Sequence, residues 1–220
     1  MRGFITSLAV FAALVLCPVL RAQDQSGERI PDEVFYLMPE FGDGTIYFRG
    51  QNPARGKLNI CAVDNTLRFI DDKGQELSAE STDNILMVQI DTVKFLHDQE
   101  GFYRMYPVNS RTGIALQRNV KILVGAKKGA YGMVDQTSSI RQYSTIYSES
   151  GMYNLTRNYP YEVSEEIYLY MGNYVTPLTK KNLKKMFPSR KEDIDAYFKA
   201  GHPLPKTVSD ALQLISLWAE

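Results

Sequence analysis

Cysteine and histidine are scarce in this chain of 220 residues, which contains two of each. So few cysteines exclude a scaffold held together by disulfides. Neither His97 nor His202 has a second histidine or cysteine at the spacing of a zinc site, so we predict no metal site and no cofactor. Both histidines are interpreted as solvated turn residues. Cys61 lies in the apolar stretch LNICAV, and we interpret it as a packed side chain rather than a reactive thiol.

An excess of charge of either sign is also lacking, because 25 lysines and arginines balance 25 aspartates and glutamates. Nucleic acid is held by clustered positive charge, so we expect no nucleic-acid partner. A long apolar run is missing as well. The run from Phe4 to Leu16 is shorter than the roughly 20 residues of a membrane-spanning helix.

The first 22 residues have the parts of a secretory signal peptide. Arg2 precedes the apolar run, and Ala22 supplies a small residue before a polar boundary. Cys17 allows a lipoprotein interpretation, which its neighbours Leu16 and Pro18 disfavour. We therefore expect export, cleavage after Ala22, and no transmembrane span in what remains. Cleavage removes two arginines and no acidic residue, which leaves 23 basic against 25 acidic residues and a net charge of −2.

Residues 23–163 show short apolar segments separated by turn residues, without a helical period. This pattern predicts an antiparallel β meander closed into a sandwich or an open barrel. Two turns stand out, GQNPARG at 50–56 and DDKG at 71–74. The expected strands are 45–48, 57–63, 67–70, 75–77, 84–90, 92–96, 102–108 and 113–124, the last being one long strand or a pair.

Residues 164–220 change in character, and together with the β region they predict an α+β protein. A hairpin is expected at 165–178, with Met171-Gly172-Asn173 as its turn. Three short helices follow. Thr179 is expected to cap the first, Ser189 and Glu192 to form a capping box for the second, and Thr207 to begin the third.

Catalytic signatures are missing from the sequence. It has no G-x-S-x-G elbow and no phosphate loop ending in G-K-[ST], so we assign no catalytic residue. The aspartates of DDKG are interpreted as turn formers. A glycosidase needs two carboxylates whose spacing is spatial, so the sequence leaves a hydrolase acting on glycan or peptide open as an alternative.

The stretch KKGAYGMVDQTSS, at 127–139, looks most like a functional loop. We interpret it as a connector, in which glycines let the chain leave the sheet and hydroxyl side chains bond to exposed backbone. If a ligand binds here, the candidate residues are Lys127, Lys128, Tyr131, Gln136 and Thr137.

Several stretches together resemble a group of uncharacterised exported proteins from Gram-negative bacteria of the Bacteroidetes kind. They are FGDGTIYFRG, KLNIC, RFIDDKG, DTVKF, GFYRM, AYGMVDQTSS and NLKKMFP. The chain departs from this group at Cys61, where a polar residue is expected after L-N-I. The resemblance implies a similar order of β segments with a helical end, and it supplies no catalytic residue.

These observations favour a non-enzymatic protein of the periplasm or cell surface that binds a protein or envelope component. The motivation is the missing nucleophile, metal and phosphate signatures beside a well-specified strand-rich scaffold. A hydrolase remains the alternative. A carrier of an apolar ligand inside the β domain is the second alternative.

Overall fold

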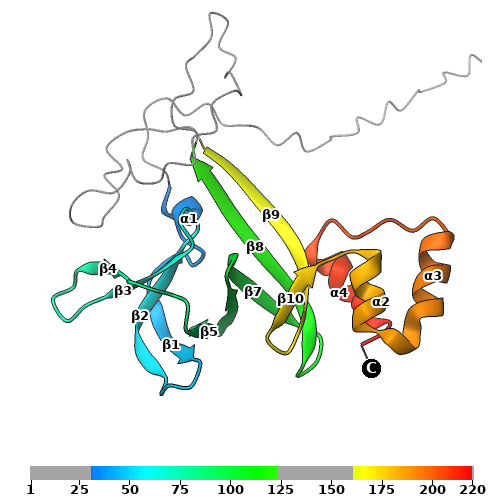
Figure 1. Cartoon of the computed structure of the whole chain (residues 1–220). Helices are drawn as coiled ribbons and strands as arrows, with labels where there is room; N and C mark the ends of the chain where they lie inside the picture. Colours follow the sequence, from blue (N-terminus) through cyan, green and yellow to red (C-terminus); the bar gives the residue numbers. More distant parts are fainter. Residues whose placement is uncertain (1–30, 123–160, 220) are drawn as a thin grey trace, which may run out of the picture.

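The computed structural model describes residues 31–122 and 161–219, and it shows an α+β fold (Figure 1). One antiparallel sheet of ten strands is followed by short helices at the C-terminal end. The strands are β1 (Gly42–Phe48), β2 (Ala54–Cys61), β3 (Thr66–Ile70), β4 (Glu76–Ser78), β5 (Ile85–Ile90), β6 (Val93–Asp98), β7 (Gly101–Pro107), β8 (Thr112–Ile122), β9 (Tyr161–Met171) and β10 (Tyr174–Pro177). The helices are α1 (Asp32–Phe35), α2 (Lys180–Met186), the 3₁₀ turn η2 (Pro188–Arg190), α3 (Lys191–Lys199) and α4 (Val208–Ser216).

The strand order is β10-β9-β8-β7-β6-β5-β1-β2-β3-β4. From β5 to β10 each strand lies beside the next one in the chain, as the predicted meander requires. The exception is β1, which lies between β2 and β5. All ten strands belong to one sheet, so the open-barrel form of the prediction describes the molecule better than two stacked sheets.

The sheet curls so that β8 touches the end of β2. The backbone N–H of Val120 on β8 donates a hydrogen bond of 3.1 Å to the carbonyl of Ala62, just after β2. Apolar side chains from five strands form one core of the sheet: Leu58, Ile60, Leu67, Ile85, Val88, Ile90, Phe95 and Phe102. All of these are almost completely buried. Their burial is the main source of stability for this part of the fold.

Local turn chemistry fixes the hairpins that the sequence predicted. Asp71 Oδ1 accepts hydrogen bonds from the backbone N–H groups of Lys73 and Gln75, at 2.9 and 2.8 Å. Gly74 closes the same turn with a φ of +77°. Between β9 and β10, Gly172 has a φ of +59°, which suits glycine. The turn-forming role predicted for Asp71 is thus confirmed.

The segment 113–124 was expected to form one strand or two, and its described part, 113–122, belongs to the single strand β8. Its partner β9 pairs with it from Met171 to Tyr161 without a break in register. The expected domain boundary at 163/164 falls inside β9. The sheet therefore continues across this point, and β9 joins the meander to the C-terminal hairpin and helices.

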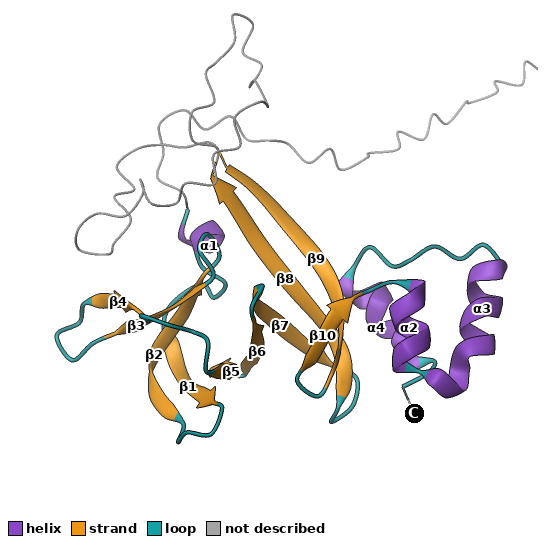
Figure 2. Ribbon diagram, in the orientation of Figure 1, coloured by secondary structure: helices purple, strands orange, loops and turns teal. Residues whose placement is uncertain are grey.

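Helices α2, α3 and α4 pack against the sheet near β8, β9 and β10, as Figure 2 shows. Thr179 and Thr207 cap α2 and α4, because their hydroxyls accept from the N–H groups of Asn182 and Asp210. The cap predicted at Thr179 and the helix start predicted at Thr207 are confirmed. The buried side chains of this cluster are Ile114, Leu169, Leu178, Leu183, Phe187, Ile194, Ala211, Leu214, Ile215 and Trp218.

The capping box expected for the second helix is wrong. The 3₁₀ turn η2 intervenes, so α3 begins at Lys191 after Arg190, without a side-chain cap. Two partly exposed ion pairs link this helix to α2. Asp195 binds the ammonium groups of Lys180 and Lys184 at 2.7 and 2.6 Å, and these hydrogen bonds lower the pKa of Asp195 to about 2.

Candidate functional site

An open trough of about 690 Å³ lies on the outer face of the sheet, across β1, β2, β3 and β5. The pairing register places its side chains next to one another. Thr45 on β1 lies opposite Arg55 on β2 and Gln89 on β5, and Asp43 lies opposite Lys57. The full lining is Asp43, Gly44, Thr45, Arg55, Gly56, Lys57, Ile70, Asp71, Asp72 and Gln89.

The charges in this trough are mixed and solvated. Lys57 Nζ lies 3.1 Å from Asp43 Oδ1, and the two side chains are 54% and 84% exposed. Two cations, Arg55 and Lys57, face three carboxylates. A pair this exposed is screened by water and contributes little to stability. These side chains are thus available for contact with another molecule at little cost to the fold.

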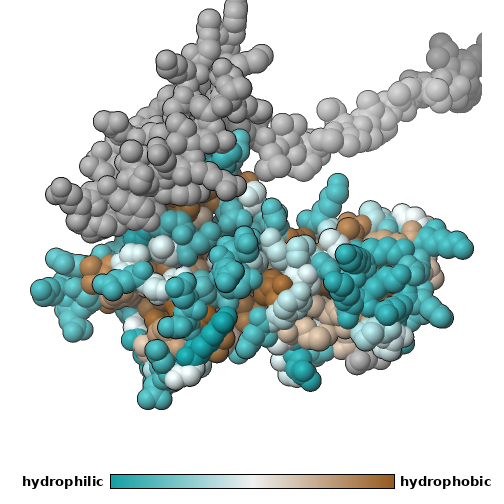
Figure 3. Space-filling view, in the orientation of Figure 1, coloured by the Kyte–Doolittle hydropathy of each residue, from teal (hydrophilic) through white to brown (hydrophobic). Residues whose placement is uncertain are grey.

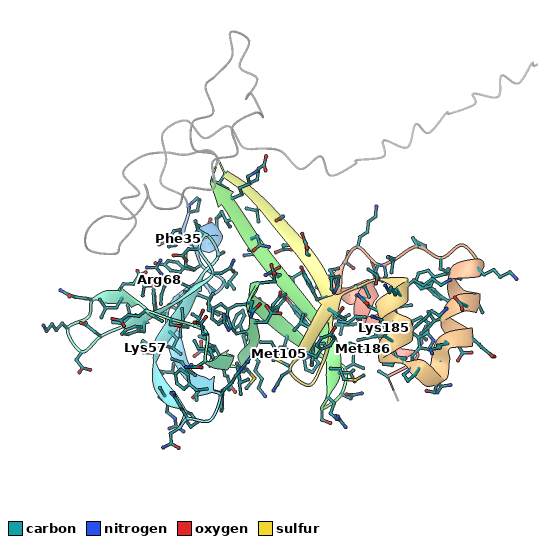
Figure 4. The ribbon with its side chains drawn as sticks, viewed as in Figure 1. Phe35, Lys57, Arg68, Met105, Lys185 and Met186 are labelled. Atoms are coloured by element: carbon teal, nitrogen blue, oxygen red, sulfur yellow. The ribbon has the colours of Figure 1, made fainter. Side chains whose placement is uncertain are left out.

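A buried charge network supports one wall of the trough. Arg68 on β3 binds Asp64 through Nη2 and Oδ2 at 2.7 Å, and the two side chains are only 2% and 6% exposed. Arg68 Nη1 also lies 4.0 Å from Glu76 Oε1 on β4. The hydroxyl of Tyr36 donates to Glu76 Oε2 at 2.8 Å. Figure 4 shows Arg68 and Lys57 on the side of the molecule formed by β1 to β4.

This network explains how the wall is positioned. Glu76 pairs with Ile70 across the β3–β4 hairpin, whose turn carries Asp71 and Asp72. Holding Glu76 against Arg68 and Tyr36 therefore holds the turn over the trough. Burial and the neighbouring Glu76 carboxylate raise the pKa of Tyr36, so its hydroxyl stays protonated and remains a donor.

His97 was expected in a polar turn, and this prediction is wrong. The residue belongs to β6 and is only 9% exposed. Its Nδ1 lies 3.3 Å from the carbonyl of Ile85, and its ring centroid lies 4.5 Å from that of Phe102. Burial lowers the pKa of His97. The turn itself begins one residue later, at Asp98, which accepts from the N–H of Glu100.

His97 is one of the residues that line a second depression of about 450 Å³. Its lining is Arg49, Asp83, His97, Asp98, Gln99 and Glu100. The imidazole contributes one edge, while its other contacts are to Ile85 and Phe102 in the core. Because burial disfavours the imidazolium, His97 serves here as a packed neutral ring.

Cys61 is completely buried, as predicted. It packs at the end of β2 with Phe35, Ala62, Val63 and Val120. Burial raises the pKa of this thiol, and nearby Asp64 raises it further. The thiolate that a nucleophile or metal ligand requires is therefore disfavoured.

His202 lies on the surface after α3, where its ring stacks on Tyr197 with centroids 4.4 Å apart. The solvated position predicted for it is confirmed, since the residue is exposed. The five loop candidates, Lys127, Lys128, Tyr131, Gln136 and Thr137, lie outside the described residues.

Sequence reasoning missed Arg68 and Tyr36. The signal for Arg68 is its position in LRFI, where a long cation sits inside an apolar strand. Such a cation is either on a solvated face or paired in the interior, and only its neighbours in space decide between the two. Tyr36 carries no local signal of this kind.

Comparisons with protein-family models, curated proteins and solved structures found no match. Within residues 31–122 and 161–219, no group of three or more histidine, cysteine, aspartate or glutamate side chains is arranged to hold a metal ion. No helix in the same ranges is long and apolar enough to cross a membrane.

Proposed function

We propose that this protein is exported to the periplasm or cell surface of a Gram-negative bacterium and there binds a protein or envelope component. The signal-peptide pattern of residues 1–22 supports export. The observation that supports binding is the trough across β1, β2, β3 and β5. It offers mixed, solvated charges on a rigid sheet.

The properties of the trough favour recognition over chemistry. Asp43 and Lys57 stand in water, so their charges act in a high dielectric. A reaction centre instead relies on side chains shielded from water, where electrostatic effects are strong. Solvated charges of both signs contribute mainly to the rate and specificity of association between proteins. The described part of the face drawn in Figure 3 is largely hydrophilic, with hydrophobic areas between.

The turn between β3 and β4 makes the trough specific. Asp71 Oδ1 accepts a hydrogen bond from the N–H of Gln75, and Arg68 ties the hairpin to Asp64. A partner with complementary charge therefore meets a preorganised wall, which reduces the entropy lost on binding.

The binding proposal is tested with residues 23–220 as bait on envelope extracts, followed by titration of the recovered partner. The variant Arg55→Glu with Lys57→Glu reverses both cations of the trough, and we expect it to weaken binding at least about tenfold. Lys191→Glu with Lys199→Glu makes the same change of charge at two exposed positions of α3, outside the trough, and serves as the matched control. Equal binding by wild type and the double variant would contradict a role for the trough.

Two further measurements address the alternatives. Hydrolysis of a glycan or peptide substrate that is lost in Asp72→Asn would replace the binding proposal with the hydrolase. A small apolar molecule retained in native mass spectrometry would favour the carrier.

Export has its own test. Expression of the full chain in a Gram-negative host, followed by fractionation and intact-mass measurement, is expected to yield a periplasmic or surface protein beginning at Gln23. A cytoplasmic protein that retains residues 1–22 would contradict it.

A further inference from the structure

Within residues 31–122 and 161–219, no strand pairs with the outer edge of β9 over about half of its length. β8 pairs with β9 from Met171 to Tyr161, whereas β10 covers only Tyr168 to Met171 on the other side. Leu178 adds one hydrogen bond of 3.1 Å to the carbonyl of Ile167. Beyond that point, no described strand pairs with residues 161–166. Figure 1 shows the upper half of β9 with β8 beside it and no other labelled element along its outer side.

The backbone groups at this edge can be identified from the register. N–H and C=O groups of successive strand residues point to opposite sides. Since the carbonyl of Ile167 points outward to Leu178, those of Glu165, Val163 and Tyr161 point outward as well. Three residues thus offer donors and acceptors to an added strand. In natural proteins an exposed strand at the edge of a sheet is normally short, interrupted or covered.

The two terminal strands of the sheet, β4 and β10, show such protection. At one end of the sheet, β4 is only three residues long. At the other, β10 is four residues long and ends at Pro177, which lacks an N–H. The open part of β9 is longer than either and contains no proline.

The side chains along the open edge define a partner. Glu162, Ser164 and Glu166 lie on one face of the sheet, while Tyr161, Val163 and Glu165 lie on the other. Glu165 is neutralised by Arg118 on β8, at 2.8 Å. Within the described chain, neither Glu162 nor Glu166 forms an ion pair, although Glu166 accepts a hydrogen bond from Tyr168 at 3.0 Å.

Val163 is the apolar element of this pattern. Its side chain is 41% exposed, although its cross-strand neighbour Val120 is buried in the core beside Cys61. An added strand that places an apolar residue opposite Val163 would extend this buried layer by one position. The residues on either side of it would then lie on the face of Glu162 and Ser164.

We propose that residues 161–166 of β9 bind an extended peptide segment of a partner protein as an additional strand, with basic residues facing Glu162 and Glu166 and an apolar residue beside Val163. Main-chain hydrogen bonds supply the attachment and alternate side chains the selectivity. A second copy of this chain fits less well, because pairing two such edges sets glutamates against glutamates. The inference rests on the proposed function in that the partner is a protein.

The probe is a short capped peptide in which lysine alternates with valine, titrated against residues 23–220 by fluorescence anisotropy. One control peptide replaces lysine with glutamate. The other keeps every lysine but has proline in place of the valines, so it has the same charge and cannot complete the ladder. We expect binding of the first peptide alone, weakening as salt rises. Equal binding of the proline peptide would overturn the proposal, since charge alone would then explain the interaction.

Two variants locate the site on β9. Val163→Pro removes an outward N–H, which is not used in pairing with β8, and should weaken peptide binding about tenfold. Val163→Thr keeps that N–H and is the matched control. If Val163→Pro unfolds, Glu162→Lys with Glu166→Lys provides the second variant and should abolish binding. Unchanged affinity in a folded variant, or a concentration-dependent dimer that the peptide does not dissociate, would overturn the proposal.

Failure of this inference can be distinguished from failure of the proposed function. A partner that binds wild type and Val163→Pro equally, but not the trough variant, leaves the proposed function in place and removes the role of β9. Peptide binding at β9 without any envelope partner would support the role of β9 and contradict the proposed function.

Discussion

Arg68 and Asp64 form an ion pair 2.7 Å long in which both side chains are almost completely buried. Asp64 lies in the turn between β2 and β3, and Arg68 follows four residues later within β3. Thr66 reinforces the same turn by donating from its N–H and its hydroxyl to Asp64 Oδ1, at 3.1 and 2.7 Å. The pair therefore joins a local turn to the β3–β4 hairpin that forms a wall of the trough.

Removal of one partner of this pair should destabilise the protein strongly. Arg68→Met leaves the Asp64 carboxylate buried without its cation, and we expect the free energy of unfolding to fall by about 3–5 kcal/mol. Urea unfolding of residues 23–220 measures the change. Arg118→Met provides the control, because the Arg118–Glu165 pair is 34% and 44% exposed and such pairs contribute at most about 1 kcal/mol. Equal losses in the two variants would contradict the role of burial.

The turns and caps could be predicted because their causes are local. In DDKG, Asp71 bonds to the backbone two and four residues on, and Gly74 takes the positive φ. Thr179 and Thr207 cap helices whose first turns follow directly. Each of these features depends on side chains within five positions, so the sequence displays both partners together.

The wrong prediction for His97 and the missed burial of Arg68 have non-local causes. In the sequence His97 follows the apolar stretch 92–96 and precedes Asp98, and only the pairing of β6 with β7 places its ring against Phe102. The buried state of Arg68 depends on Tyr36 and Glu76, which come from separate segments. The missed start of α3 is different, because the 3₁₀ turn after Pro188 competes locally with the expected capping box.

The trough was not predicted for a similar reason. Its opposite charges come from Asp43 on β1 and Lys57 on β2, which the register brings together. The sequence shows both residues but not the pairing offset of the two strands. Register is set by packing of the buried face, here by Leu58 and Ile60, and no local signal states it.

Cys61 should be inert in the folded protein. It is completely buried, and burial raises the pKa of its thiol. In residues 23–220 it is the sole cysteine, so a chromogenic thiol reagent reports on it alone. We expect negligible reaction at neutral pH in buffer and one equivalent in concentrated urea. Rapid stoichiometric reaction without denaturant would show that the thiol is accessible.

Gly113 should not tolerate a side chain. An added Cβ would overlap the carbonyl of Tyr106 on β7 and approach Tyr170 Cε1 on β9 to 2.6 Å. Gly113→Ala must therefore separate strands at the point where β7, β8 and β9 meet. We expect a loss of about 1–3 kcal/mol from overpacking, measured by thermal unfolding. Gly56→Ala is the matched control, because its Cβ would only contact Leu58 at 3.7 Å.

The helices should unfold together with the sheet. Ile215 on α4 is completely buried in a cluster that includes Ile114 and Leu169 of the sheet. Ile215→Ala should cost about 2–5 kcal/mol, whereas the exposed Gln213→Ala should change stability by less than about 0.5 kcal/mol. Trp218, the sole tryptophan, packs in this cluster and supplies a fluorescence signal. Its transition should coincide with loss of β-sheet circular dichroism, and separate transitions would show that the helices unfold independently.

His97 should make stability depend on pH below neutrality. Burial lowers the pKa of His97 in the folded protein, while the unfolded chain retains a value near 6.5. Between these two pKa values the unfolded state holds more protons, so the free energy of unfolding falls as pH decreases from about 6.5 towards the folded value. His97→Gln cannot titrate there and should lack this contribution, whereas the same substitution at exposed His202 should retain it. The measurement is the difference in unfolding free energy between wild type and each variant from pH 7.5 to 5. A constant difference for His97→Gln would mean that the buried imidazole is not the group responsible.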